Sequence, residues 1–429
     1  MRTAIAGLGT VGAEVVRQLL DKDELYAQRA ERPITVTDVS ARDRKRDRGF
    51  PMRDIRFWKD PVKMAREAKV DLVVELIGGA DGVAKRVVEA AIAAGKHVVT
   101  ANKALLARHG MQLARAAEER GVTLAFEAAV AGSIPAVEIL RQALVANIFS
   151  RVGGILNGTC NYILWRMSAM GCTFDQSLAE AQEAGYAEAD PSRDISGKDT
   201  ADKLAILAAL AFGVPVDLSS IHVEGIEQIT ALDIQRAREL GMGVKLLGIA
   251  RLTEQGLERW VHPCLVPADA VLAMVPGATN AVSVTGDLVE TQVYLGQGAG
   301  AKSTTSAVIA DILDLATGRR LPAFGKLAAQ LRAVPVLVPR DRTGEYYLRL
   351  QVADQPRVLG DVLSLLGMQG VSVASNEQPE QQVDPDGTVA VFLTTHRTQE
   401  AAVQRALTMI RALPTVKGEP CLIRIEREV

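Results

Sequence analysis

A glycine-rich turn near the first residue constrains the fold of this chain more than any other feature. Gly7-Leu8-Gly9-Thr10-Val11-Gly12 follows a short apolar segment at 3–6 and opens a segment with apolar residues at helical spacing. Between a strand and a helix, Gly7 permits a tight turn, Gly9 lets the backbone approach a pyrophosphate, and Gly12 allows close helix–strand packing. The helix N-terminus then faces the anion. We therefore expect a dinucleotide to bind at Gly7, Gly9, Thr10, Val11 and Gly12.

Strand and helix patterns alternate over the first 126 residues. Strands are predicted at 34–39, 71–77, 97–100 and 122–126, and a helix at 83–94. This alternation predicts a Rossmann-type parallel sheet covered on both faces. Ligands bind at the carboxyl ends of such strands, where Thr100 and Lys103 stand. A lysine at this edge can bind phosphate, substrate or a developing alkoxide; the alternative is a surface lysine that opens the next helix.

Two neighbouring features point to different coenzymes. Asp38 ends the second predicted strand, where an acidic residue meets the ribose hydroxyls of NAD. Arg42 follows shortly afterwards in a basic loop, and an arginine there can hold the 2′-phosphate of NADP. A solvated basic loop is the alternative reading of Arg42. The sequence therefore predicts NAD or NADP and leaves the choice open.

The pattern changes after residue 129. A helix is predicted at 136–144 and a strand at 151–156; short strands without intervening helices follow at 244–252, 259–266, 281–285 and 288–295. These strands predict a mostly antiparallel sheet, distinct from the first domain, that covers the cleft and supplies a dimer surface. The glycine-rich segment 296–301 precedes a helix from about 302 to 316. It predicts a second backbone contact with the coenzyme; a flexible domain connection is the alternative.

Charged side chains are concentrated in the stretch 185–203, which carries Glu188, Asp190, Asp194, Asp199 and Lys203. Pro191 disfavours a helix through 187–192. From Ser196 to Phe212 the chain is expected to be helical, so Asp199 and Lys203 share a face one turn apart. The bland alternative is a capped, solvated helix start with Ser196 at its first turn. Because a nucleotide fold precedes the stretch and a glycine loop follows it, we interpret it as the substrate half of an active site.

An Asn-Gly pair at 157–158 predicts a tight turn just before a helix at 163–170. The hydroxyl of Thr159 is expected to project from this turn into a cleft. Cys160 is a possible nucleophile by residue type. No histidine lies near it in the sequence, so a small buried cysteine is the default interpretation.

The last part of the chain has its own pattern. Residues 321–344 contain three prolines and are predicted to be a linker. From 345 to 429 the strand and helix signals follow the order βαββαβ, which is the split βαβ plan.

Six segments, in chain order, resemble the homoserine dehydrogenases: GLGTVG at 7–12, VELIGG at 74–79, TANKALLA at 100–107, FEAAVAGSIP at 126–135, NGTCNYIL at 157–164 and GYAEADPSRDISGKDTADKLAIL at 185–207. The resemblance covers about residues 1–320. It implies reduction of L-aspartate 4-semialdehyde to L-homoserine with NAD(P)H, in the biosynthesis of threonine and methionine.

The resemblance also implies roles for individual residues. Lys203 donates a proton to the nascent alkoxide, Asp199 orients Lys203, and Lys103 sits between coenzyme and substrate. Glu188 holds the amino-acid end of the substrate, with Asp190, Asp194 and Thr159 around it. The second coenzyme loop corresponds to Gly300 and Thr304, and a site for Na⁺ or K⁺ corresponds to Glu127 with backbone groups of Val130, Gly132 and Ile134.

The C-terminal unit resembles an ACT domain, a small regulatory module of amino-acid metabolism, with Arg357 where that family usually has glycine. This resemblance implies an amino-acid effector, with threonine expected, in a homodimer or homotetramer. A purely structural dimerisation unit is the alternative. The expected domains are 1–130 with about 300–320 for the dinucleotide, 131–299 for substrate and dimerisation, and 345–429 for regulation.

Composition excludes several other classes of protein. A net charge of −2 and an aromatic fraction of 4% do not suit nucleic-acid binding, and no apolar run reaches membrane-spanning length. Four scattered cysteines and the lack of a leader pattern predict a cytoplasmic protein with reduced thiols. The rival functions are another dehydrogenase of an aspartate-like substrate and an inactive nucleotide-binding sensor; the long 185–207 motif disfavours the first, and Lys203, Asp199 and Glu188 disfavour the second.

Overall fold

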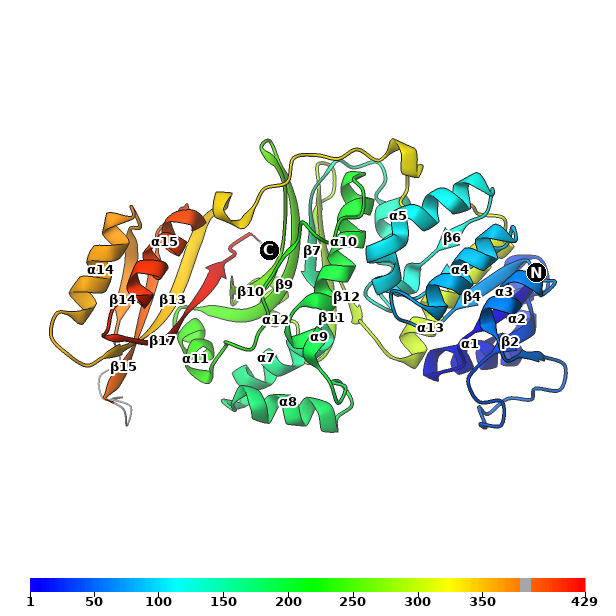
Figure 1. Ribbon diagram of the computed structural model, residues 1–429, viewed down its shortest axis with the longest axis horizontal. Helices are drawn as coiled ribbons and strands as arrows, with labels where there is room; N and C mark the ends of the chain where they lie inside the picture. Colours follow the sequence, from blue (N-terminus) through cyan, green and yellow to red (C-terminus); the bar gives the residue numbers. More distant parts are fainter. Residues whose placement is uncertain (379–386, 429) are drawn as a thin grey trace.

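The computed structural model describes residues 1–378 and 387–428. Residues 379–386, which fall in the region predicted to resemble an ACT domain, and Val429 lie outside the described residues. The molecule is elongated (Figure 1), with the N-terminal α/β part at one end, a large sheet in the middle and a smaller α/β unit at the other end.

The N-terminal part is built on a parallel sheet of six strands in the order β3-β2-β1-β4-β5-β6. The strands are β1 (Arg2–Ala6), β2 (Thr35–Ser40), β3 (Arg56–Trp58), β4 (Leu72–Glu75), β5 (His97–Thr100) and β6 (Leu124–Ala125). The strand order reverses between β1 and β4, and ligands bind at such a switch point. The predicted Rossmann-type sheet is therefore confirmed, with strand ends within about three residues of those expected.

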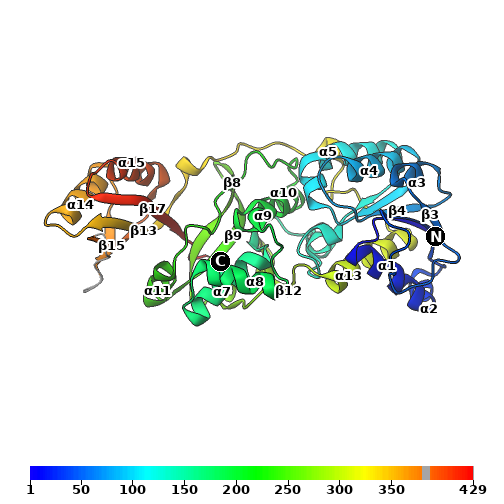
Figure 2. The same cartoon turned by 60° about the horizontal axis from the view of Figure 1, so that its bottom comes forward.

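Helices cover both faces of this sheet (Figure 2). On one face lie α1 (Thr10–Asp21), α2 (Asp23–Ala30) and α13 (Ala301–Ala316), and on the other α3 (Pro61–Glu67), α4 (Val83–Ala93) and α5 (Lys103–Glu119). The helix α13 returns from the second half of the chain and packs against α1, so the N-terminal core is completed by residues about three hundred positions away.

Among the described residues the second sheet has eleven strands, and its main path runs β12-β11-β7-β9-β10-β17-β13-β15-β14. Its first part contains β7 (Phe149–Ile155), β8 (His222–Val223), β9 (Met242–Thr253), β10 (Gly256–Pro267), β11 (Thr279–Gly286) and β12 (Glu290–Gln297). Most neighbours are antiparallel, as expected, but β10 pairs in parallel with both β8 and β17, so the sheet is mixed. The helices of this region are α6 (Ala136–Glu138), α7 (Gly158–Met170), α8 (Phe174–Glu183), α9 (Ser192–Ile195), α10 (Lys198–Phe212), α11 (Ala231–Glu239) and α12 (Val271–Met274).

The C-terminal unit contains β13 (Thr343–Ala353), α14 (Val358–Met368), β14 (Val373–Glu377), β15 (Thr388–Thr395), β16 (Thr398–Gln399), α15 (Glu400–Arg411) and β17 (Val416–Ile425). Apart from the short β16, this is the predicted βαββαβ order. Its sheet is continuous with the central sheet, because Cys264 and Leu265 of β10 pair with Arg424 and Ile425 of β17. The sequence predicted a separate unit connected by a linker, because sequence patterns do not indicate this pairing of β10 with β17.

Three predicted helices differ from the structure, and the first is α7, which was expected to begin at Ile163 and begins at Gly158. The helix expected to begin at Ser196 begins at Lys198, after Gly197, whose φ of 79° lies in the left-handed region. Ser196 instead ends α9, so its predicted capping role for α10 is wrong. The reason is the turn between the two helices, which needs a residue tolerant of positive φ. The helix expected at 136–144 is one turn of α-helix followed by a π-helical segment, Ile139–Ala143.

Among the described residues, no helix has both the length and the apolar character that crossing a membrane requires.

Candidate active site

The helix α10 carries the charged cluster on its first turns and is buried over most of its length. It packs against α5 of the N-terminal part and against β7 and β9 of the central sheet. Asp199 and Lys203 are each 7% exposed. The predicted i,i+4 pair is therefore present, and it lies where the two halves of the molecule meet.

The Lys203 ammonium group is fixed by two acceptors. Its Nζ donates to Oδ2 of Asp199 at 2.7 Å and to the carbonyl oxygen of Leu156 at 2.6 Å. An ammonium group has three N–H donors. Two are used by these described atoms, and the third is available for the oxygen of a substrate.

Lys103 approaches the same carboxylate from the other side. It is the first residue of α5, directly after β5, and its Nζ lies 3.0 Å from Oδ1 of Asp199. Burial alone would raise the pKa of Asp199, but the ammonium groups of Lys203 and Lys103 outweigh it and lower that pKa. The Asp199 carboxylate in turn raises the pKa of Lys103. Asp199 is thus ionised and bridges two cations.

Asn157 was not among the predicted site residues, yet it organises the cluster. Its Nδ2 donates to Oδ1 of Asp194 at 2.8 Å and to Oδ2 of Asp199 at 2.9 Å. Its Oδ1 accepts from the N–H of Cys160 at 2.8 Å and so caps α7. The Asn-Gly pair suggested only a turn; the capping preference of asparagine before a helix was the signal that would have located it.

Thr159 and Asp194 form the next part of the site. The Thr159 hydroxyl lies 2.7 Å from the Tyr186 carbonyl oxygen and 3.2 Å from Oδ2 of Asp194. Burial, followed by the nearby Asp199 carboxylate, raises the pKa of Asp194. An ammonium group on a ligand would relieve both effects, because it would pair with the carboxylate.

Cys160 lies beside this cluster but is not poised as a nucleophile. It is fully buried, its Sγ donates to the Asp194 carbonyl oxygen at 3.1 Å, and burial raises its pKa well above the usual value. A thiolate is the reactive form of cysteine. The default interpretation from the sequence therefore agrees with the structure.

The other two predicted carboxylates lie outside the buried cluster. Glu188 and Asp190 are exposed. Asp190 Oδ1 accepts from the N–H of Ser192 at 3.1 Å, and the carbonyl oxygen of Glu188 accepts from Gln182 Nε2 at 3.1 Å. The structure thus brings together Lys103, Thr159, Asp194, Asp199 and Lys203, with Glu188 and Asp190 at the surface.

A hollow of about 600 Å³ lies along the glycine-rich turn. A Cβ atom at Gly7 would lie 2.6 Å from the Leu76 carbonyl oxygen, and one at Gly12 would lie 1.9 Å from the Gly7 carbonyl oxygen. A Cβ at Gly9 would meet no atom within 4 Å. Packing therefore explains two of the three glycines. Gly9 lines the hollow, where the missing side chain leaves room for a ligand such as a pyrophosphate.

Several basic residues line this hollow, whereas Asp38 is not among its lining residues. Ser40, Arg42, Arg46 and Lys59 line it. Asp38 is 4% exposed; its carboxylate accepts from Trp58 Nε1 at 2.6 Å and from the Thr37 hydroxyl at 2.8 Å. The structure therefore pairs the Asp38 carboxylate with two side chains of the protein.

Other predicted coenzyme residues lie at the ends of buried elements. The Thr100 hydroxyl donates to Oε2 of Glu75 at 2.7 Å, and Glu75 also accepts from the N–H groups of Ile77 and Gly78. This fully buried glutamate shapes two strand ends, and no role was predicted for it from the sequence. Gly300 has a φ of 121° and precedes α13, whose first turn contains Thr304.

The loop predicted to hold a monovalent cation has an unexpected side-chain arrangement. The Glu127 carboxylate accepts from the N–H groups of Val137 at 3.0 Å and Glu138 at 2.8 Å, so it caps α6. Burial and the neighbouring Asp311 carboxylate raise the pKa of Glu127 to about 8. Gly132 has a φ of 56°, and a Cβ there would lie 2.7 Å from the Gln297 carbonyl oxygen. The loop therefore packs on the second glycine-rich segment, and the Glu127 carboxylate is directed to backbone N–H groups of α6.

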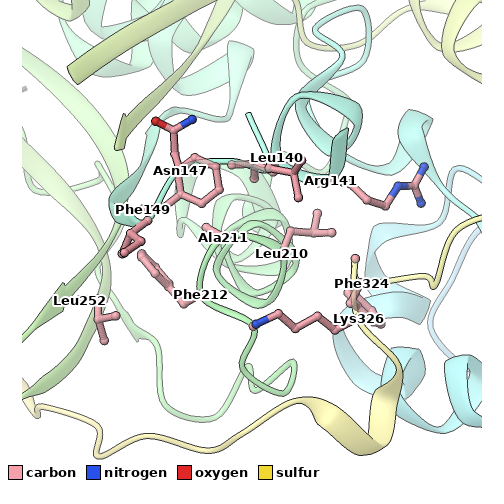
Figure 3. Close-up of a pocket in the computed structure, with 14 residues that line it drawn as sticks. Leu140, Arg141, Asn147, Phe149, Leu210, Ala211, Phe212, Leu252, Phe324 and Lys326 are labelled. Atoms are coloured by element: carbon pink, nitrogen blue, oxygen red, sulfur yellow. The ribbon is translucent and has the colours of Figure 1, made fainter. Parts of the chain in front are cut away.

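A second hollow, of about 270 Å³, lies at the C-terminal end of α10, where Leu210, Ala211 and Phe212 line it (Figure 3). Its walls are mainly apolar and include Leu140, Phe149, Leu210 and Phe212, with the Lys326 ammonium group nearby. Because it lacks the carboxylates and the glycine-rich backbone, it does not suit the coenzyme or a charged substrate.

Comparison with known proteins gives consistent matches over the whole chain. A sequence profile described as the homoserine dehydrogenase NAD binding domain matches residues 7–127, and a profile described as homoserine dehydrogenase matches residues 135–313. The homoserine dehydrogenase of Neisseria gonorrhoeae is 42% identical over 428 residues, which are 98% of each chain. That of Pseudomonas aeruginosa is 42% identical over 435 residues, covering 100% of this chain and 99% of the other. A crystal structure of a homoserine dehydrogenase from Thiobacillus denitrificans superposes with a TM-score of 0.92 at 41% identity, covering 100% of this chain and 98% of that one.

Proposed function

Since the chain belongs to the homoserine dehydrogenase family, we propose that it interconverts L-aspartate 4-semialdehyde and L-homoserine with Lys203 as the acid–base group. The protein is an NAD(P)-dependent oxidoreductase. The observation that carries the proposed chemistry is the buried Lys203 ammonium group, which Asp199 and the Leu156 carbonyl oxygen hold in one place.

Reduction of an aldehyde needs a hydride, a proton and stabilisation of the negative oxygen. When bound, a nicotinamide coenzyme supplies the hydride. Lys203 supplies the proton through its remaining N–H, and its positive charge stabilises the developing alkoxide. In the reverse direction the neutral Lys203 amine takes the proton from the hydroxyl group of homoserine.

Asp199 and Lys103 support this step. Asp199 keeps the Lys203 side chain in a fixed position, because both of its oxygens are bound to ammonium groups. Lys103 adds a second positive charge on the coenzyme side of the site and is placed to contact the substrate oxygen or the coenzyme. Both roles are electrostatic, and they are strongest when water is excluded from the site.

The substrate's ammonium group is the natural partner of the carboxylates. Of the three carboxylates at 188, 190 and 194, that of Asp194 lies closest to the catalytic pair, because Asn157 binds both Asp194 and Asp199 and Thr159 contacts Asp194. Glu188 and Asp190 are exposed on the adjoining segment. We assign them to the outer part of the substrate site, where contacts with the amino-acid end are made after the segment adjusts to the ligand.

The basic residues of the first hollow favour NADP as the preferred coenzyme. Arg42, Arg46 and Lys59 line the hollow, whereas the Asp38 carboxylate is bound to Trp58 and Thr37. A 2′-phosphate would meet positive charge at this position. Among the residues that line the hollow, Asp43 alone carries a carboxylate that would repel the phosphate. NAD is the alternative coenzyme.

A monovalent cation, if bound, is held by backbone oxygens of the loop that contains Val130, Gly132 and Ile134, together with that of Glu127. Neutral carbonyl ligands suit Na⁺ or K⁺. The proposed role is structural, because this loop contacts the second glycine-rich segment through Gly132 and Ser133.

The C-terminal unit is proposed to be an ACT domain that binds an amino acid, with threonine as the feedback inhibitor. Its element order and its sheet order β17-β13-β15-β14 support this proposal. In the same scheme residues 1–130 and about 300–320 bind the coenzyme, 131–299 bind the substrate and form a dimer contact, and 321–344 connect to the regulatory unit at 345–429. A homodimer or homotetramer in the cytoplasm is the proposed state.

One assay tests the central proposal. The protein is mixed with aspartate semialdehyde and either NADPH or NADH, and coenzyme oxidation is followed. Turnover with NADPH supports the assignment; no turnover with either coenzyme contradicts it. Addition of threonine to the same assay tests regulation, and unchanged activity contradicts threonine as the inhibitor.

A further inference from the structure

A buried arginine of the C-terminal unit is held between two carboxylates, one of which belongs to the substrate region. Arg424, in β17, is 1% exposed. Its Nε donates to Oε2 of Glu400 at 3.3 Å, and its Nη2 donates to Oε1 of Glu224 at 2.7 Å; Nη1 pairs with the other oxygen of Glu224. A bidentate arginine–carboxylate pair fixes the relative orientation of its partners. The position of Glu224 is therefore tied to β17 and to the first turn of α15.

Residues 224–226, here called the Glu224 turn, pack on residues 195–197, which lie between Asp194 and Asp199 in the sequence. The Glu224 N–H donates to the Val261 carbonyl oxygen at 2.7 Å, and the Ile226 N–H donates to the Ile195 carbonyl oxygen at 2.9 Å. A Cβ atom at Gly225 would lie 2.3 Å from that Ile195 oxygen. The turn therefore touches the backbone at the end of α9 without room for a side chain between them.

The touched segment carries active-site groups at both ends. Asp194 directly precedes Ile195, and Gly197 begins the path into α10 and towards Asp199. A Cβ at Gly197 would lie 3.2 Å from the Glu224 carbonyl oxygen. Any displacement of the Glu224 turn therefore reaches the segment that places Asp194 against Asn157 and Thr159.

We infer that Glu224 is a positioning residue for the substrate carboxylates: held by Arg424, it sets the place of residues 194–197. It acts through Ile195 and Gly197, with the C-terminal strand β17 as its anchor. The inference rests on the proposed function, in which Asp194 meets the substrate. It also makes the C-terminal unit part of the structure that supports the substrate site, independently of any effector.

The test compares two variants, each of which removes one carboxylate charge at the junction, which is the contact between the C-terminal unit and the central sheet. Glu224→Gln keeps the size of the side chain and removes its charge. The expected result is a KM for aspartate semialdehyde raised about 3- to 30-fold, with the KM for NADPH unchanged. Glu426→Gln is the matched control, because Glu426 is 4% exposed and pairs with Arg342 at 2.5 Å in the same junction. It is expected to lower Tm without changing either KM.

Hydrogen exchange gives a readout that does not depend on turnover. The backbone amides of residues 194–199 are expected to exchange several-fold faster in the Glu224→Gln variant than in wild type, and at the wild-type rate in the Glu426→Gln variant. Should Glu224→Gln fail to fold, Arg424→Lys replaces it, since lysine keeps the charge but cannot make the bidentate contact.

The outcomes separate the inference from the proposed function. An unchanged KM and unchanged exchange in the Glu224 or Arg424 variant overturn the inference, as does an equal effect of Glu426→Gln on the substrate KM. If wild-type protein fails to turn over aspartate semialdehyde, the proposed function fails, and the exchange data alone decide whether Glu224 holds the 194–199 segment.

Discussion

Nζ of Lys103 lies 3.0 Å from Oδ1 of Asp199, which joins the start of α5 in the nucleotide-binding part to the first turn of α10 in the substrate part. The other oxygen of the same carboxylate holds Lys203 at 2.7 Å. One carboxylate therefore sets the separation of two ammonium groups from different parts of the chain. The catalytic proposal depends on this separation, because the reacting oxygen must be within reach of Lys203.

Replacing Lys203 by methionine is expected to lower kcat about 10²- to 10⁴-fold, because the proton donor is lost while the side-chain length is kept. Steady-state kinetics with aspartate semialdehyde and NADPH measure the effect. Lys198→Met is the control, since Lys198 is an exposed lysine on the same helix. A near-normal rate for the Lys203 variant would remove this residue from the acid–base role.

Asn157→Ser tests the amide that bridges Asp194 and Asp199. Serine also caps helices well, so α7 keeps its N-cap while the bridging Nδ2 donor is lost. A hydrogen bond to a charged group contributes about 1.5–3 kcal/mol, so kcat/KM is expected to fall roughly 10- to 100-fold. Asn157→Asp should be worse, because it adds a third carboxylate to the cluster. Wild-type kcat/KM in both variants would show that the bridge is not needed.

Arg42→Ala is expected to raise the KM for NADPH about 10- to 100-fold and to leave the KM for NADH almost unchanged, since only NADPH carries the 2′-phosphate. Arg44→Ala is the matched control from the same basic loop, because the Arg44 guanidinium lies over the Phe57 ring, 5.8 Å from its centroid. Equal changes for both coenzymes in the Arg42 variant would contradict NADP recognition by this residue.

Lys245 makes a specific prediction for the pH dependence of stability. Burial lowers its pKa from 10.5 to about 8, and its Nζ donates to Asn161 Oδ1 and to the Val275 carbonyl oxygen. Between pH 8 and 10.5 the unfolded state keeps the lysine proton and the folded state has released it, so the free energy of unfolding rises with pH. At 1.36 kcal/mol per pKa unit, the gain is about 3 kcal/mol.

Denaturant unfolding at several pH values gives the free energy of unfolding of the wild type and of Lys245→Met. The gain appears as a difference between these two free energies that grows with pH. The wild type should gain stability relative to the variant as pH rises through this window. The exposed Lys198→Met variant should follow the wild-type curve throughout. Parallel curves for wild type and Lys245→Met would show that the folded state keeps the proton.

Arg357→Gly is expected to stabilise the C-terminal unit. Arg357 precedes α14 with a φ of 78°, in the left-handed region. That conformation costs a non-glycine residue about 1–2 kcal/mol, partly offset because glycine has more freedom in the unfolded chain. A net gain of about 1 kcal/mol should appear as a higher Tm. Gly370→Ala, at a φ of 76°, should lower Tm by a similar mechanism; a lower Tm for Arg357→Gly would mean that the arginine side chain makes a stabilising contact.

The parts of the fold that follow from local patterns were predictable. Glycine spacing located the turn at Gly7, and short apolar segments located five of the six parallel strands to within a few residues; β3 (Arg56–Trp58) was missed because it is only three residues long. Helical spacing placed Asp199 beside Lys203, because both lie on one helix. The βαββαβ order of the C-terminal unit was readable for the same reason.

The parts that depend on contacts between distant segments were not predictable. The amide of Asn157 meets Asp194 and Asp199 only after three segments have packed together. Asp38 has the residue type and position of a ribose ligand, but Trp58, twenty residues further on, supplies the N–H that its carboxylate accepts. The pairing of β10 with β17 joins residues about 160 positions apart, and neither strand carries a local sign of its neighbour.

The place of β17 inside the central sheet has a practical consequence for protein engineering. A shortened catalyst that ends before β13 would expose the edge of β10 at Cys264 and Leu265, both fully buried in the intact chain. Bare strand edges recruit other chains and lead to aggregation. A stable minimal enzyme would therefore need a redesigned edge, with charged side chains or a proline on β10. Without that redesign, a truncated protein that loses regulation could not be distinguished from one that has aggregated.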